Sequence, residues 1–169
     1  MLKSSDIYVL LGIAAHNGEK FTFRDLAARL DVPVPLVQRS LARLSRSGLY
    51  VESRRQAHLP NLEEFLVHAL RYIAPATLGA VTPGIPAAWA APPLAGRIVG
   101  DELPPVWASA HPKVRGVAIE PLHAAAVEAV DDDPRLGQLL ALADCFRAGD
   151  LRVRREAEAA LHELLGAKS

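Results

Sequence analysis

The stretch LDVPVPLVQRSLARLSRSGLYVESRR, residues 30–55, decides how the first third of this 169-residue chain folds. Val32-Pro33 predicts a turn, because the residue before a proline is pushed out of the helical region. Pro35 suits the first turn of a helix, where its missing N–H costs nothing. An apolar stripe at helical spacing follows, made of Val37, Leu41 and Leu44. Gly48 is a natural stop, so the stretch predicts a helix with one buried face.

The sequence on either side of this stretch predicts two more helices and a hairpin. Residues 4–16 predict a first helix, whose inner face carries Ile7, Leu10, Leu11 and Ala14. Residues 21–23 are expected to be a short extended piece, and residues 24–31 a second helix. After the helix that ends near Gly48, residues 49–51 and 57–59 are predicted to form two strands joined by a tight turn.

This order of elements and the pattern LxVPxPxVQRSLxRLxxxGL resemble the winged helix-turn-helix domains of bacterial regulators of the MarR-like kind, over roughly residues 5–60. The hydrophobic frame carries the resemblance: Leu26, Ala27, Leu30, Val32, Val37, Leu41, Leu44, Gly48 and Leu49. It implies that residues 1–60 form a winged helix-turn-helix domain that binds double-stranded DNA. The chain departs from the family at residues 33–35, where Pro-Val-Pro replaces the usual Ser or Thr. A hydroxyl there would cap the helix or contact a DNA phosphate, so that contact is weaker or differently made.

The helix that begins at Pro35 is expected to leave four polar side chains facing outward: Gln38, Arg39, Arg43 and Arg46. In a helix-turn-helix, outward residues near the start of the second helix meet base edges in the major groove. Gln can bridge an adenine edge and Arg a guanine edge. We therefore predict base contacts from Gln38 and Arg39, phosphate contacts from Arg43 and Arg46, and backbone or minor-groove contacts from Arg54 and Arg55 at the wing tip. The alternative is that these arginines only form a solvated helix face.

The distribution of charge supports the DNA-binding interpretation more than the total does. The formal net charge is zero, which by itself argues against a nucleic-acid binder. Residues 1–60, however, carry nine Lys and Arg against five Asp and Glu, a balance of +4. Residues 61–169 carry ten against fourteen, a balance of −4. Such an asymmetry between halves suggests different partners for the two regions.

Residues 61–169 are predicted to form a mainly helical region, which makes the whole chain an α+β protein dominated by helices. Asn61 is expected to cap a helix over residues 61–74. The remaining predicted elements are a β-hairpin with strands at 105–108 and 114–119, and helices over 121–130, 134–149 and 151–166, the last two capped by Asp133 and Asp150.

Residues 75–96 form an unusual segment, because they hold five prolines and three glycines but no charged side chain. The prolines exclude a regular helix over most of it. A neutral, apolar loop of this length either packs on its own domain or binds a partner. We predict an ordered, packed loop with Trp89 as its anchor. If the loop instead binds a partner, Trp89 is the expected partner-binding residue.

The sequence offers little chemistry. It has no Gly-rich phosphate loop and no G-x-S-x-G elbow. Its six histidines lack metal-ligand spacing, Cys145 is expected in the core, and the acidic run 131–133 is expected to be a solvated cap. We predict no catalytic residues, no metal, no cofactor and no enzymatic activity. With no signal-peptide order and no apolar run of membrane-spanning length, we expect a cytoplasmic protein without membrane contact.

Two functions remain open from the sequence. The first is a DNA-binding transcriptional regulator. The second is a protein-interaction module, such as an antitoxin or accessory subunit, in which the winged helix is a scaffold and the C-terminal half binds a partner protein. In either case we expect a homodimer, because helix-turn-helix proteins commonly read two half-sites. The apolar helices at the two ends of the chain are the predicted dimer seam.

Overall fold

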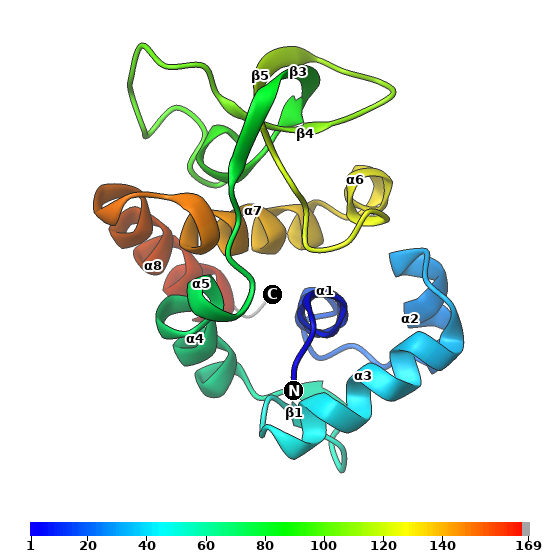
Figure 1. Cartoon of the computed structure of the whole chain (residues 1–169). Coiled ribbons are helices and arrows are strands. Elements are labelled where there is room, and N and C mark those ends of the chain that lie inside the picture. The colour runs from blue at the N-terminus through cyan, green and yellow to red at the C-terminus, as the bar shows by residue number, and fades with distance from the viewer. Residues whose placement is uncertain (167–169) are drawn as a thin grey trace.

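The computed structural model describes residues 1–166 and has an α+β fold (Figure 1). Over that range there are eight α-helices: α1 (Ser4–Ala15), α2 (Phe23–Leu30), α3 (Val34–Arg46), α4 (Leu59–His68), α5 (Leu70–Ile73), α6 (Ala126–Ala129), α7 (Pro134–Ala148) and α8 (Leu151–Gly166). The strands are β1 (Tyr50–Val51), β2 (Gln56–Ala57), β3 (Leu78–Pro86), β4 (Pro105–Ala108) and β5 (Val114–Ile119). β1 and β2 form a two-stranded sheet, and β3, β4 and β5 close into a small barrel.

Helix α1 lies at the centre of the molecule, between α2 and α3 on one side and α7 on the other (Figure 1). All nine residues from Asp6 to Ala14 are buried, so the prediction of a single buried face was too narrow. The sequence IYVLLGIAA is apolar on every side, and such a helix belongs inside a core. Gly12 lets α2 pack closely against α1, because a Cβ atom at this position would clash with the Leu30 side chain of α2.

Helices α2 and α3 follow closely the bounds that the sequence predicted. The prediction of an extended piece over residues 21–23 is wrong at its last residue, because α2 already begins at Phe23. Thr22 Oγ1 accepts from Asp25 N at 3.0 Å, and Thr22 N donates to Asp25 Oδ2 at 3.2 Å. This reciprocal capping box fixes the helix start. Asp31 ends α2 in the left-handed conformation with φ of 54°.

The hairpin β1–β2 is shorter than predicted on its return strand. β2 ends at Ala57, because His58 caps the next helix instead of continuing the strand. His58 Nδ1 accepts from Asn61 N at 3.2 Å. The prediction that Asn61 caps this helix is therefore wrong, and the helix begins at Leu59. It is also interrupted at Ala69, which separates α4 from the short α5.

The barrel departs most from the sequence prediction. The expected Pro-rich loop contains the nine-residue strand β3, which pairs antiparallel with both β4 and β5. β4 and β5 have the predicted bounds, but they pair parallel to each other and do not form a hairpin. Gly84 and Gly116 make the closure possible, because a Cβ atom at either position would collide with the backbone of the β4 segment. An extended strand tolerates prolines where no ladder N–H is needed.

The C-terminal helices pack over α1 and the barrel. Asp133 and Asp150 cap α7 and α8 as predicted, accepting from Leu136 N at 3.1 Å and Val153 N at 2.9 Å. The helix predicted over 121–130 is wrong in its first half, since only α6 and a 3₁₀ turn over Val130–Asp132 form.

One hydrophobic cluster runs through α1–α4, α7, α8 and the barrel, so the core does not divide at residue 60. The cluster includes all of the middle of α1 and the inner face of α8, namely Val153, Ala157, Ala160, Leu161 and Leu165. The apolar surfaces of both terminal helices are thus used inside the chain. The dimer seam predicted on these helices therefore has no free apolar face there, and the homodimer itself stays a prediction.

Candidate nucleic-acid interface

Helix α3 presents one buried and one exposed face along its whole length. Val37 and Leu44 are completely buried, and Leu41 is nearly so. The exposed side chains are Pro35, Gln38, Arg39, Ala42 and Arg46. Their spacing follows the helical period, so they form one continuous stripe. Gln38, Arg39 and Arg46 are therefore exposed as predicted, while their contact with DNA stays a prediction.

Arg43 does not belong to this stripe, and the prediction that it faces outward is wrong. Its Nε donates to Asp6 Oδ2 at 2.8 Å, and its Nη2 donates to Asp6 Oδ1 at 2.8 Å. Asp6 is completely buried at the start of α1 and also accepts from Ser40 Oγ at 2.7 Å and from Lys3 N at 2.8 Å. The planar guanidinium matches the carboxylate with two parallel bonds. Arg43 thus joins α3 to α1.

The electrostatics of Asp6 keep Arg43 in this position. Burial raises the pKa of Asp6, but the hydrogen bonds from Arg43, Lys3 and Ser40 and the charge of Arg43 outweigh burial. The net result is a pKa below the ordinary value, so the carboxylate is ionised at neutral pH. An ionised, buried carboxylate needs its counter-charge, so Arg43 is held at Asp6 through its Nε and Nη2 groups.

The hairpin places two arginines at its turn. Arg54 is exposed, and Arg55 adopts a left-handed backbone with φ of 53°. The Arg55 guanidinium carbon lies 4.8 Å from the ring centre of Phe23 and 5.7 Å from that of Phe21. These cation–π contacts orient the side chain without neutralising it, and they link the hairpin turn to the start of α2.

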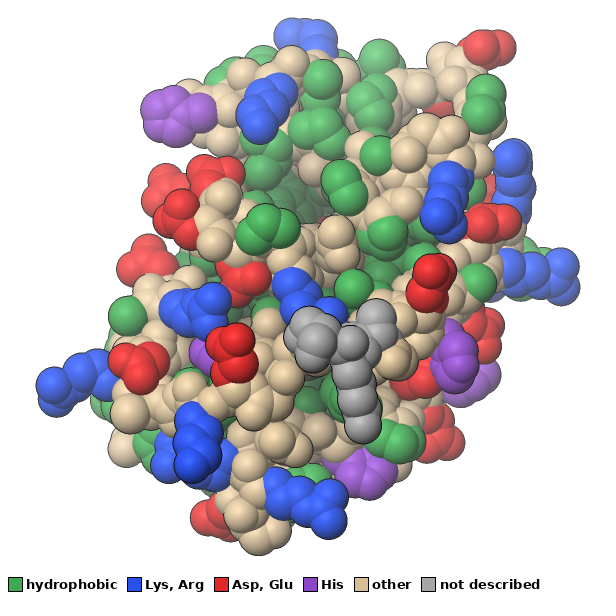
Figure 2. Space-filling model, turned by 180° about the vertical axis from the view of Figure 1, so that it is seen from behind, with side chains coloured by type: hydrophobic (Ala, Val, Ile, Leu, Met, Phe, Trp, Pro, Cys, Tyr) green, Lys and Arg blue, Asp and Glu red, His purple; other side chains and the backbone are tan. Residues whose placement is uncertain are grey.

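The resulting surface carries Gln38, Arg39, Arg46, Arg54 and Arg55. Within residues 1–166, none of its four arginines forms an ion pair with a carboxylate. Figure 2 shows several Lys and Arg side chains on the lower part of the molecule, the end at which Figure 1 places α3 and the hairpin. The arrangement can bind a polyanion through its charges and can form hydrogen bonds to base edges through Gln38 and Arg39.

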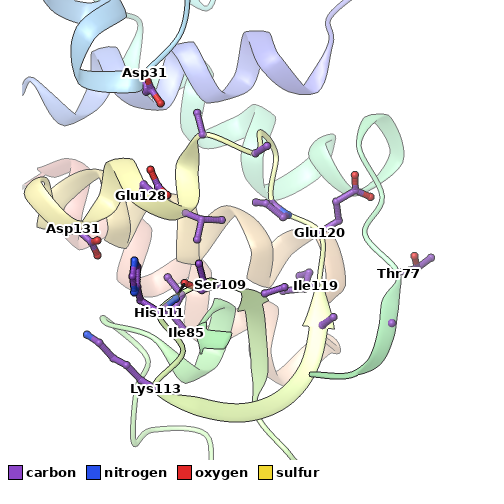
Figure 3. Close-up of a pocket in the computed structure, with 18 residues that line it drawn as sticks. Asp31, Thr77, Ile85, Ser109, His111, Lys113, Ile119, Glu120, Glu128 and Asp131 are labelled. Atoms are coloured by element: carbon purple, nitrogen blue, oxygen red, sulfur yellow. Dashed lines mark hydrogen bonds between the residues drawn. The ribbon is translucent and has the colours of Figure 1, made fainter. Parts of the chain in front are cut away.

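A cleft of about 1120 Å³ opens elsewhere, between the barrel, α6 and the turn after α2. In Figure 3, Asp31, Glu128 and Asp131 lie on its helical side, while His111 and Lys113 come from the barrel side. Its floor is apolar and includes Ile85 and Ile119. Sequence reasoning missed this cleft, because its walls come from segments up to about a hundred residues apart and no local motif marks them.

A second buried carboxylate, also missed from the sequence, holds the barrel to α7. Asp144 accepts from Trp107 Nε1 at 2.8 Å and from Arg147 Nη1 at 2.7 Å. Arg147 also donates to the carbonyl oxygens of Ala74 and Glu120. Burial raises the pKa of Asp144 to about 6, although Arg147 and Trp107 act in the opposite direction. Its partner Trp107 lies 37 residues away along the chain, so no local pattern marked this centre.

Trp89, the expected anchor of the Pro-rich segment, is only partly buried. It packs against the core from a 3₁₀ turn over Ala88–Ala90. The completely buried side chains of this segment are instead Ala88 and Leu94. Trp89 also lines a shallow depression on the surface of the barrel.

No family model matches this chain, and no curated protein or solved structure matches it significantly. In the part of the chain that the structure describes, no group of three or more His, Cys, Asp or Glu side chains could hold a metal ion. No helix in that same part is long and apolar enough to cross a membrane.

Proposed function

We propose that this protein is a DNA-binding transcriptional regulator, with α2 and α3 as a helix-turn-helix and β1–β2 as its wing. The observation that supports it is the exposed stripe of α3. Gln38, Arg39 and Arg46 face solvent there without a carboxylate partner among the described residues, while Val37 and Leu44 are completely buried. A helix that enters the major groove needs one face for the core and one for the duplex.

The contact residues fall into two groups. Gln38 and Arg39 lie in the first half of α3 and read base edges. Arg46, Arg54 and Arg55 contact phosphates and position the domain without reading sequence. We do not include Arg43 among the proposed phosphate contacts, because its guanidinium is bonded to Asp6. We expect the protein to bind as a homodimer, since one helix reads too short a site for useful specificity.

Salt dependence provides the direct test of this proposal. With two to three phosphate contacts per protomer, a dimer should show a log–log slope of affinity against salt of about −4 to −5. The measurement is a fluorescence-anisotropy titration of the protein with the duplex upstream of its own gene and with a scrambled duplex, at several salt concentrations. The absence of binding to both duplexes at low salt would rule out the regulator.

Three variants separate the roles of the residues. Arg46→Ala should weaken binding to every sequence and flatten the slope by about two units, because each protomer of the dimer then neutralises one phosphate fewer. Gln38→Ala should relax preference at one base pair by about 1 to 3 kcal/mol and leave the slope unchanged. Arg155→Ala, an exposed arginine on α8, is the matched control and should change neither quantity.

A second candidate function is a protein-interaction module, such as an antitoxin or accessory subunit, that retains the helix-turn-helix as a scaffold. The cleft supports it, because Asp31, Glu120, Glu128 and Asp131 line its walls and make no ion pair among residues 1–166. A basic segment of a partner protein would complement this surface. Failure to bind any duplex at low salt, together with salt-sensitive binding of a basic partner, would favour this function over the first.

A further inference from the structure

Most of the exposed large apolar side chains belong to one stretch of the chain. Nine large hydrophobic residues are exposed among the described residues, and seven of them lie between positions 72 and 114: Tyr72, Ile73, Leu78, Val81, Val99, Leu103 and Val114. This range contains the barrel strands β3 and β4 and the segments that lead into them. Within this range, Leu78 and Leu103 lie together in one depression on the barrel, and a contiguous exposed apolar patch marks an interaction site.

The barrel carries the centre of this surface, which we call the outer strand face. It consists of Leu78, Val81, Trp89, Leu103 and Val117. Four of these residues, all except Val81, line one shallow depression of about 310 Å³. Val81 pairs with Val117 across β3 and β5, so their side chains are neighbours on the same face. Leu78 is 53% exposed and Leu103 50%.

Two opposite charges flank the outer strand face. Glu102 lines the depression together with Leu78, which is the first residue of β3. Arg115 pairs with Pro83, and on β5 it lies four residues from Ile119, the partner of Leu78, which is roughly 13 Å along a strand. Gly116 faces β4, so the alternation of β5 turns Arg115 outward with Val117. Neither charge forms an ion pair within residues 1–166.

We propose that a second copy of this chain docks on the outer strand face and forms a two-fold dimer. In a two-fold interface the same patch serves both subunits, so it must complement itself. An apolar centre with an acidic residue at one end and a basic residue at the other does so. A two-fold axis through the centre brings Glu102 of each copy to Arg115 of the other.

The occupant is a second copy because the outer strand face carries both charges and so complements itself, and because the apolar faces of two other helices are not free. α1 and the inner face of α8 lie in the core of the same chain. This dimer rests on the proposed function in one respect, namely that a regulator reading two half-sites needs two copies. The barrel lies at the end of the molecule away from α3 (Figure 1), so docking there leaves both α3 stripes free. The two α3 helices then lie far apart, and the half-sites should be separated by more than one helical turn.

The test is the mass of the protein in solution without DNA. Sedimentation velocity at concentrations from about 1 to about 100 µM should show a species of twice 18.2 kDa. Leu103→Asp should shift the population to the monomer, since it places a charge at the apolar centre. Leu151→Asp is the matched control, because Leu151 is 55% exposed on α8 and should leave the dimer intact. A wild-type monomer at the highest concentration, or an unaffected Leu103→Asp dimer, would overturn the proposal.

Charge reversal tests the pairing itself. Glu102→Arg and Arg115→Glu should each weaken the dimer by about tenfold or more, because each brings like charges together. The double variant restores both pairs and should recover most of the affinity. Single variants that dimerise normally, or a double variant no tighter than the singles, would contradict this geometry. A dimer that binds no DNA would reject the proposed function and leave this interface standing.

Discussion

Two buried carboxylates hold this molecule together, and they differ in how they are satisfied. Asp6 accepts four hydrogen bonds, two from Arg43 and one each from Ser40 and Lys3. Asp144 accepts two, from Trp107 and Arg147. The pKa of Asp6 lies below its ordinary value, while burial raises the pKa of Asp144 to about 6.

The difference shows that burial alone does not set the charge of a carboxylate. Both side chains are at most 1% exposed, but Asp144 lies deeper, because its partner Arg147 is 5% exposed whereas Arg43 beside Asp6 is 24% exposed. Desolvation acts more strongly on Asp144, where two hydrogen bonds do not offset it, whereas four hydrogen bonds offset the weaker desolvation of Asp6. Arg147 is also shared with the carbonyl oxygens of Ala74 and Glu120, so only part of its hydrogen-bonding capacity goes to Asp144. The carboxylate of Asp6 is therefore ionised at neutral pH, whereas that of Asp144 can gain a proton near pH 6.

The largest effect is expected from breaking the Asp6 centre. Arg43→Ala leaves an ionised carboxylate buried without a counter-charge and should lower the free energy of unfolding by about 3 to 5 kcal/mol. Arg46→Ala, one turn further along α3 and exposed, is the control and should change it by about 0.5 kcal/mol or less. Urea unfolding of the two variants measures the difference. Equal stability of the Arg43→Ala and Arg46→Ala variants would show that the bond between Arg43 and Asp6 does not stabilise the fold.

The pH dependence of stability should identify the Asp144 centre. Its pKa in the folded state, about 6, lies above the ordinary value of 3.8. Between these values the folded chain keeps a proton that the unfolded chain has released, so the free energy of unfolding falls as the pH rises. A gap of about two pKa units corresponds to about 3 kcal/mol.

Asp144→Asn removes this titration. The difference in unfolding free energy between wild type and variant should therefore change by about 3 kcal/mol from about pH 4 to about pH 7, with the wild type losing stability relative to the variant. Urea unfolding at a series of pH values gives this difference directly. A difference that stays constant over the range would mean that Asp144 has an ordinary pKa.

A smaller effect is expected from removing one donor at Asp144. Trp107→Phe keeps an aromatic ring but deletes the N–H, and should lower the free energy of unfolding by about 2 kcal/mol. It should also raise the pKa of Asp144 further, because a hydrogen bond to the ionised form is lost. Trp89→Phe is the matched control, since Trp89 is half-buried and should lose less than about 1 kcal/mol. Thermal unfolding that shifts equally in both variants would argue against a special role for the Trp107 bond.

Sequence reasoning was most successful where each element depends on its own neighbours. The bounds of α2, α3, β1, β4 and β5 are close to prediction, and Asp133 and Asp150 cap the helices they were expected to cap. The exposed stripe of α3 could be read from periodicity alone. Its one error was Arg43, which has its partner 37 residues away at Asp6.

The sequence by itself determined most of the helical segments, the caps Asp133 and Asp150 and the hairpin turn, because these depend on contacts within a few residues. Tertiary structure decided the strand β3, the parallel pairing of β4 with β5, the burial of α1 on all sides and the two carboxylate centres. Each of these needs a partner that is distant along the chain, and no local pattern records which partner that is. Leu78–Pro86 is a strand because β4 and β5 satisfy its backbone, and Arg43 is a structural residue because Asp6 is buried beside it.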